Sequence, residues 1–62
     1  MTPANEFRAA RARLGITQQT LADRLKIRVG SVSSIEQGIY EPSESTLELL
    51  RYVVADGIDR GA

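Results

Sequence analysis

The sequence predicts an all-α fold, a compact bundle of four to five short helices. Apolar residues recur at helical spacing in four segments, and no alternating run of β-branched residues extends over even five positions. Only about three residues, 26–28, separate the second segment from the third. A connection this short cannot lay two helices antiparallel, so it forces them to cross steeply.

The first two helices are expected before Gly15 and between Thr17 and about Leu25. Thr2 provides a hydroxyl cap for the first helix, Pro3 occupies its first position, and Gly15 is the natural stop. Thr17 can cap the second helix. The inward-facing apolar residues of these two helices are Phe7, Ala10, Leu14, Leu21, Ala22 and Leu25.

The third helix is expected from about Val29 to Gln37, and Gly38 closes it. Val32 and Ile35 face back onto the second helix. Ile27, the apolar residue of the short connection, fills the turn between the two helices. Together these segments have the layout of a helix-turn-helix.

The fourth helix is expected to open after Pro42. Ser43 and Ser45 both offer hydroxyls, and Ser45 with Glu48 fits a capping box, in which two side chains satisfy each other's backbone amides. The helix is expected to end at residues 56–57, which read Asp-Gly. Its apolar stripe consists of Leu47, Leu50, Val53 and Val54.

Length and composition exclude several classes of function. With 62 residues the chain is expected to form one domain, residues 1–62. It contains neither cysteine nor histidine, so no metal site, no cofactor and no catalytic residue is assigned, and an enzyme is not expected. No apolar run approaches the ~18 residues of a membrane span, so no membrane partner and a cytoplasmic location are expected.

The charges are divided unevenly although they sum to zero. Residues 1–35 carry six basic and two acidic side chains, whereas residues 36–62 carry two basic and six acidic ones. One cationic end suits a partner that presents phosphates to a single face. Scattered charges on solvated faces explain the same count, so charge alone leaves both interpretations open.

The segment from Thr17 to Gly38 resembles the helix-turn-helix of the phage repressor and Cro-type family, which is also called xenobiotic-response-element-like. The family's lead, Arg-x-x-x-Gly-Leu/Ile-Ser/Thr-Gln, matches residues 11–18, and Pro42-Ser43 extends the match beyond the motif, which lies at about residues 17–38. The resemblance covers roughly residues 5–54 and implies a lambda-repressor-like DNA-binding domain. The matching motif residues are Leu21, Ala22, Leu25, Ile27, Val32, Ile35, Glu36 and Gly38.

Two residues depart from the family pattern. Lys26 occupies a turn position where the family usually has glycine, and a non-glycine residue with positive φ there costs on the order of 1 kcal/mol. Gly30 lies near the start of the third helix, where the family often places a base-reading side chain. An interior glycine also costs about 1 kcal/mol relative to alanine, so the reading helix is locally weak.

The resemblance implies that the helix at about residues 29–37 lies in the major groove of DNA. The residues expected to contact bases are Arg28, Val29, Gly30, Ser31 and Ser34. The residues expected to contact phosphates are Arg11, Gln18, Ser33, Gln37 and Tyr40.

The chemistry of these side chains leaves several roles open. Arg28 can pair with guanine or hold a phosphate, and Val29 can contact a thymine methyl group. Ser31 can read a base or cap the helix, and Tyr40 can bind phosphate or cover the edge of the core. The family also commonly pairs the residues that match Arg11 and Glu36, which would divide that arginine between folding and DNA.

The function implied is that of a sequence-specific transcriptional regulator, a repressor of phage or mobile-element type that binds an inverted-repeat operator in double-stranded DNA as a homodimer. In so short a chain the dimer surface is expected on the fourth helix and the tail, at Leu49, Tyr52, Val53 and Ile58. The alternative is a protein-interaction module, such as an antitoxin with a toxin partner or an adaptor that retains the helix-turn-helix.

Overall fold

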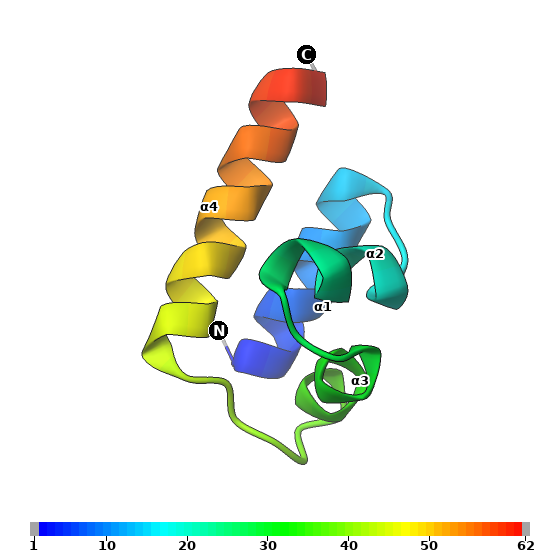
Figure 1. Ribbon diagram of the computed structural model, residues 1–62, viewed down its shortest axis with the longest axis vertical. Helices are drawn as coiled ribbons and strands as arrows, with labels where there is room; N and C mark the ends of the chain where they lie inside the picture. Colours follow the sequence, from blue (N-terminus) through cyan, green and yellow to red (C-terminus); the bar gives the residue numbers. More distant parts are fainter. Residues whose placement is uncertain (1, 62) are drawn as a thin grey trace.

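The computed structural model describes the backbone of residues 2–61 and the side chains of residues 2–57. Within this part the protein is all-helical and contains four helices (Figure 1): α1 (Pro3–Leu14), α2 (Gln18–Leu25), α3 (Val29–Glu36) and α4 (Glu44–Gly61). None of these helices combines the length and the apolar sequence that crossing a bilayer would require. The all-helical architecture confirms the predicted fold class. The described part contains four helices, the smaller of the two expected numbers.

Three of the helices begin with a hydroxyl side chain at the cap position. For one of these helices the cap residue differs from the one predicted from the sequence. Thr2 Oγ1 accepts a hydrogen bond from the Asn5 amide at 3.2 Å, as predicted. Thr17 Oγ1 likewise accepts one from the Thr20 amide at 3.1 Å. The prediction of a capping box at Ser45 is wrong. The Ser43 hydroxyl accepts from the Thr46 amide at 3.2 Å, and Leu47 N–H donates to the Ser43 carbonyl, so the helix begins two residues earlier.

The helix ends explain the positions of three residues. Gly15 and Gly38 adopt the left-handed conformation that closes α1 and α3, with φ of 65° and 78°. Gly57 does not end α4 as predicted, since the helix continues to Gly61. A Cβ atom at position 57 would instead collide with Leu14 Cδ2. This glycine leaves room for the end of the Leu14 side chain on α1, and a sequence pattern cannot distinguish that use from a helix stop.

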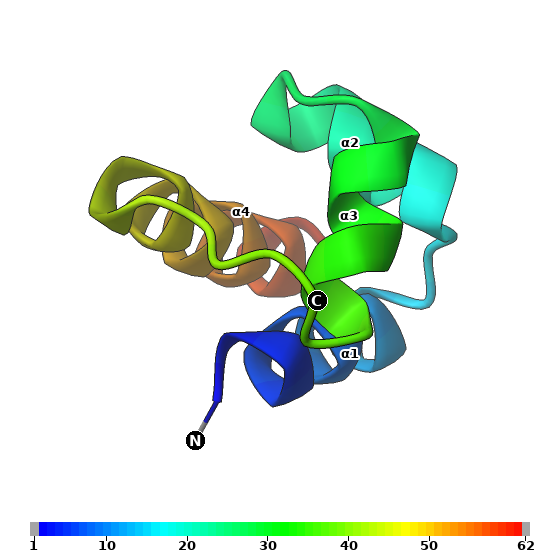
Figure 2. The same cartoon turned by 90° about the horizontal axis from the view of Figure 1, so that it is seen from below.

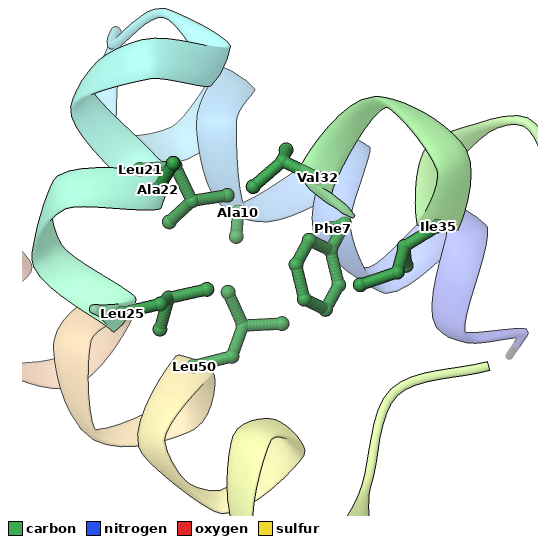
Figure 3. Close-up of a cluster of buried hydrophobic side chains, with 8 residues drawn as sticks. All are labelled: Phe7, Ala10, Leu21, Ala22, Leu25, Val32, Ile35 and Leu50. Carbon is green, nitrogen blue, oxygen red and sulfur yellow. The ribbon is translucent and has the colours of Figure 1, made fainter. Parts of the chain in front are cut away.

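All four helices contribute to one small core (Figure 3). In this view the Phe7 ring from α1 lies between Ile35 of α3 and Leu50 of α4. Partly buried side chains, including Ile27 in the turn and Val53, pack around the core. The fully enclosed members are Phe7, Ala10, Leu21, Ala22, Leu25, Val32, Ile35 and Leu50, every one of them on a predicted inward face.

The arrangement of the helices leaves α3 exposed along one side. α3 crosses α2 steeply and packs against α1 behind it (Figure 2), so its outer side carries no other helix of the described chain. α4 runs from the loop after α3 to the opposite end of the molecule (Figure 1). The C-terminal end of α4 therefore lies far from α3.

Lys26→Gly is expected to raise the free energy of unfolding by about 0.5–1 kcal/mol, because glycine tolerates the left-handed backbone better than lysine does. Lys26 ends α2 with φ of 60°, and its N–H donates to the carbonyls of Ala22 and Asp23. Urea unfolding monitored by circular dichroism measures the change. Lys26→Ala keeps the strained backbone and removes the same side chain, so an equal gain in that variant would contradict the explanation.

Candidate nucleic-acid interface

A shallow depression on the outer side of α3 gathers most of the residues that the sequence assigned to DNA. Arg28, the cap residue of α3, lines it together with the first turn of the helix, and two residues of the loop after α3 line it as well. All five residues expected to contact bases line it. The lining consists of Arg28, Val29, Gly30, Ser31, Ser34, Ile39 and Tyr40.

The N-terminus of α3 faces this depression with unsatisfied backbone amides. Arg28 is the cap residue, with φ of −78° and ψ of 148°, and its side chain makes no capping hydrogen bond. The Ser31 N–H donates to the Arg28 carbonyl, so the alternative in which Ser31 caps the helix is wrong. The amides of Val29 and Gly30 precede the first intrahelical bond and can donate to an anion.

Packing within the domain does not require a glycine at position 30. A Cβ atom built at Gly30 would meet no other atom within 4 Å, and the residue lies inside α3 without positive φ. The fold therefore has room for a side chain here. Its absence exposes backbone on the side that faces the depression.

The C-terminal turn of α3 positions the two remaining residues of the depression. Gly38 N–H donates to Ile35 O at 3.0 Å, and Ile39 N–H donates to Ser34 O at 2.9 Å, which is the Schellman arrangement. This turn folds the next residues back beside α3. Tyr40 remains 55% exposed, so the alternative in which it covers the core edge is wrong.

A buried carboxylate joins α1, α2 and the end of α3. Glu36, whose side chain is 6% exposed, accepts two hydrogen bonds from Arg11, at 2.7 Å from Nε and 2.9 Å from Nη2. Gln18 Nε2 donates to the same carboxylate at 3.1 Å. The hydrogen bonds from Arg11 hold the pKa of the Glu36 carboxyl below its usual value against the opposing effect of burial, and they raise the pKa of Arg11.

These contacts change what Arg11 and Gln18 can offer to DNA. Both were expected to contact phosphates, but their side-chain donors are directed to Glu36, as the resemblance implied for Arg11. The backbone amide of Gln18, in the first turn of α2, remains a candidate phosphate donor. Both side chains therefore help to position α3, and Arg11, which is 27% exposed, keeps further N–H groups beyond those that bind Glu36.

The other two expected phosphate contacts lie at the far end of α3. Gln37 Nε2 donates to Ser33 Oγ at 2.9 Å, one helical turn apart. Gln37 is exposed and Ser33 is half-buried. Ser33 and Gln37 do not line the depression, whereas Tyr40 does; we call these three polar side chains at the C-terminal end of α3 the polar edge.

The expected dimer residues divide into three groups. Leu49 and Tyr52 are exposed on α4, and 69% of Tyr52 is accessible. Val53 is half-buried and packs against the core, so at least part of its role is structural. Ile58 lies in α4, but its side chain is outside the described residues.

Two features of the surface were missed from the sequence. Ile39 was not among the residues assigned to DNA, yet it lines the depression. An isoleucine between a helix-ending glycine and a tyrosine was the available signal. An ion pair between Glu6 and Arg51, at 2.8 Å, also links α1 to α4, and nothing in their spacing of 45 residues indicates it.

A helix-turn-helix family model matches residues 7–51, most of the chain and all of α1, α2 and α3 except the first four residues of α1. No solved structure matches the chain. The match spans the depression, the Arg11–Glu36 pair between α1 and α3, and Gln18 of α2, which donates to the same carboxylate. Members of this family are DNA-binding transcription regulators and are not typically enzymes. The chain belongs to the Cro/C1-type helix-turn-helix family, and its all-helical fold is lambda-repressor-like.

Proposed function

We propose that the protein, as a single domain over residues 1–62, is a transcriptional repressor that binds an inverted-repeat operator as a homodimer, with α3 in the major groove. The observation that carries the proposal is the composition of the depression on α3. It contains one arginine, two serine hydroxyls and two free backbone amides, and no carboxylate. Such a surface is complementary to phosphates and base edges.

The proposed contacts follow from this placement. Arg28 pairs with a guanine or a phosphate, Ser31 and Ser34 donate to base edges, and the bare backbone at Gly30 approaches the DNA closely. Phosphates on either side are bound by the Gln18 amide and by the polar edge of Ser33, Gln37 and Tyr40.

A dimer is proposed because one reading helix covers little DNA. α3 has eight residues and is roughly 12 Å long, which limits its direct contacts to a few base pairs. Two copies related by a twofold axis read two half-sites and multiply the contacts. Leu49 and Tyr52 are three residues apart on α4, so they share a face that can pair with its copy in a partner.

Selection of bound sequences from a randomised duplex pool, followed by anisotropy titrations over a salt series, tests the proposal. We expect a palindromic site and a log affinity that falls linearly with log salt concentration. Enrichment of a single half-site would overturn the homodimer. Absence of binding at low salt would overturn DNA recognition altogether and favour a protein partner.

Tyr52→Glu is expected to convert the dimer to a monomer and to lower operator affinity by at least about tenfold, because a carboxylate in a paired apolar surface loses its hydration. Sedimentation gives the oligomeric state and anisotropy gives the affinity. Ala9→Glu is the matched control, since it adds the same charge at an exposed position of α1, away from the Tyr52 face. Equal effects of the two variants would show that the added charge, not the Tyr52 face, determines binding.

A further inference from the structure

Exposed apolar side chains concentrate at the depression on α3. Five large hydrophobic residues are exposed in the described part of the chain, and three of them line this depression. Ile39 is 75% exposed, Tyr40 55% and Val29 40%. A cluster of this kind on a small domain is typical of a binding surface. Hydrogen bonding to DNA does not account for it.

We propose that Val29, Ile39 and the ring of Tyr40 form an apolar surface that reads the C5 methyl groups of thymines in the operator. The inference rests on the proposed function and specifies the operator chemistry that this site takes. Thymine methyls are the apolar groups on base edges in the major groove. Contact with them removes both the methyl and the exposed side chains from water.

The polar side chains of the depression make this contact necessary for specificity. Arg28 is the one side chain there that can form a bidentate pair with a base. Ser31 and Ser34 discriminate weakly, because a hydroxyl can donate or accept. Gly30 offers no side chain at all. Discrimination at the remaining positions therefore depends on methyl contacts, and each half-site combines the base pair read by Arg28 with neighbouring A·T pairs.

DNA fits this apolar surface better than a protein partner does. The surface is bounded by the Arg28 guanidinium and by the free amides of Val29 and Gly30, all of them donors. No acceptor-only side chain, such as a carboxylate, lies in the lining. A partner must therefore present many acceptors beside its apolar groups. The thymine-rich major groove, flanked by phosphates, has that composition.

Replacement of single thymines by deoxyuridine in the selected operator tests the inference. Deoxyuridine lacks only the C5 methyl group and keeps every hydrogen-bonding atom. We expect about a fourfold loss of affinity at each contacted position, the fold-change that corresponds to ~0.8 kcal/mol for one buried methyl-sized group. At the same positions, 5-methylcytosine should bind better than cytosine, since it restores the methyl group on a different base.

Variants assign the methyl contacts to side chains. Val29→Ala and Ile39→Ala are each expected to reduce the thymine-to-uracil affinity ratio at one position to about one, and both residues are exposed enough for the variants to fold. Leu49→Ala is the control, because it weakens binding to both duplexes equally and leaves the ratio unchanged. Operator binding with no uracil effect anywhere would overturn the inference and leave the proposed function intact. Failure to select any operator would overturn both.

Discussion

Arg28→Ser is expected to make the domain more stable while it lowers operator affinity about tenfold to a hundredfold per half-site. Arg28 occupies the cap position of α3 without making a capping bond, and its charge lies at the positive end of the helix dipole. Serine would accept a hydrogen bond from the first turn and contribute about 1 kcal/mol. Affinity falls because the variant removes the one cation of the depression and its base or phosphate contact.

Two measurements on the same preparation separate these effects. Urea unfolding gives the free energy of unfolding, and anisotropy with the selected operator gives the affinity. Arg13→Ser is the matched control, because Arg13 is an exposed arginine of α1 that faces the α1–α4 groove. It should change affinity only slightly and uniformly across sequences. A variant at position 28 that loses stability, or that binds as tightly as the parent, would contradict a functional reason for the uncapped helix.

The sequence was sufficient for the helices because their signals are local. Hydroxyls at Thr2 and Thr17 and the glycine at position 15 act on neighbouring backbone atoms, so their spacing alone predicts the boundaries. Gly57 was misread because α4 continues past it, and the side chain for which it leaves room, Leu14, lies more than forty residues away along the chain. Ser45 was misread because Ser43 and Ser45 both offer a hydroxyl at a possible start of the helix. The preference for hydroxyl residues at the cap position does not distinguish between them.

The sequence predicted most of the residues of the candidate site, but not what each of them does. The resemblance already implied the pair of Arg11 with Glu36, but only three-dimensional proximity reveals that Gln18 donates to the same carboxylate. The role of Ile39 depends on the direction in which the Schellman turn sends the chain. Roles assigned by residue type thus fail where one buried group attracts several donors.

Arg11→Leu is expected to destabilise the domain by about 3 kcal/mol at pH 7, because it leaves the Glu36 carboxylate buried with only Gln18 as a donor. Glu36→Leu should cost less, since Arg11 is 27% exposed and can turn to water. The double variant should cost less than the sum of the two. Urea unfolding of all four proteins completes the cycle, and additive losses would contradict a coupled pair.

The dependence on pH should have opposite signs in the parent and in Arg11→Leu. In the parent, the pKa of Glu36 is depressed by Arg11, so its contribution is fully present above about pH 4.3, the usual glutamate pKa, and is lost as the pH falls through the depressed pKa. Without Arg11, burial raises the pKa of Glu36 instead. The folded variant then takes up a proton more readily than the unfolded chain, and its stability relative to the parent rises as the pH falls from 7 toward 5.

The pair between Glu6 and Arg51 provides the comparison within the same chain. It has nearly the same bond length as the buried pair, at 2.8 Å against 2.7 Å, but the Arg51 side chain is 57% exposed. The carboxylate left behind by Arg51→Leu is that of Glu6, which is 19% exposed against 6% for Glu36 and can return to water, so this variant should change stability little. If the two arginine variants were equally destabilising, loss of packing by the arginine stems would explain both. A loss of stability that occurs in Arg11→Leu but not in Arg51→Leu, and that becomes smaller at acid pH, would instead show that the buried charge of Glu36 holds α3 in its orientation.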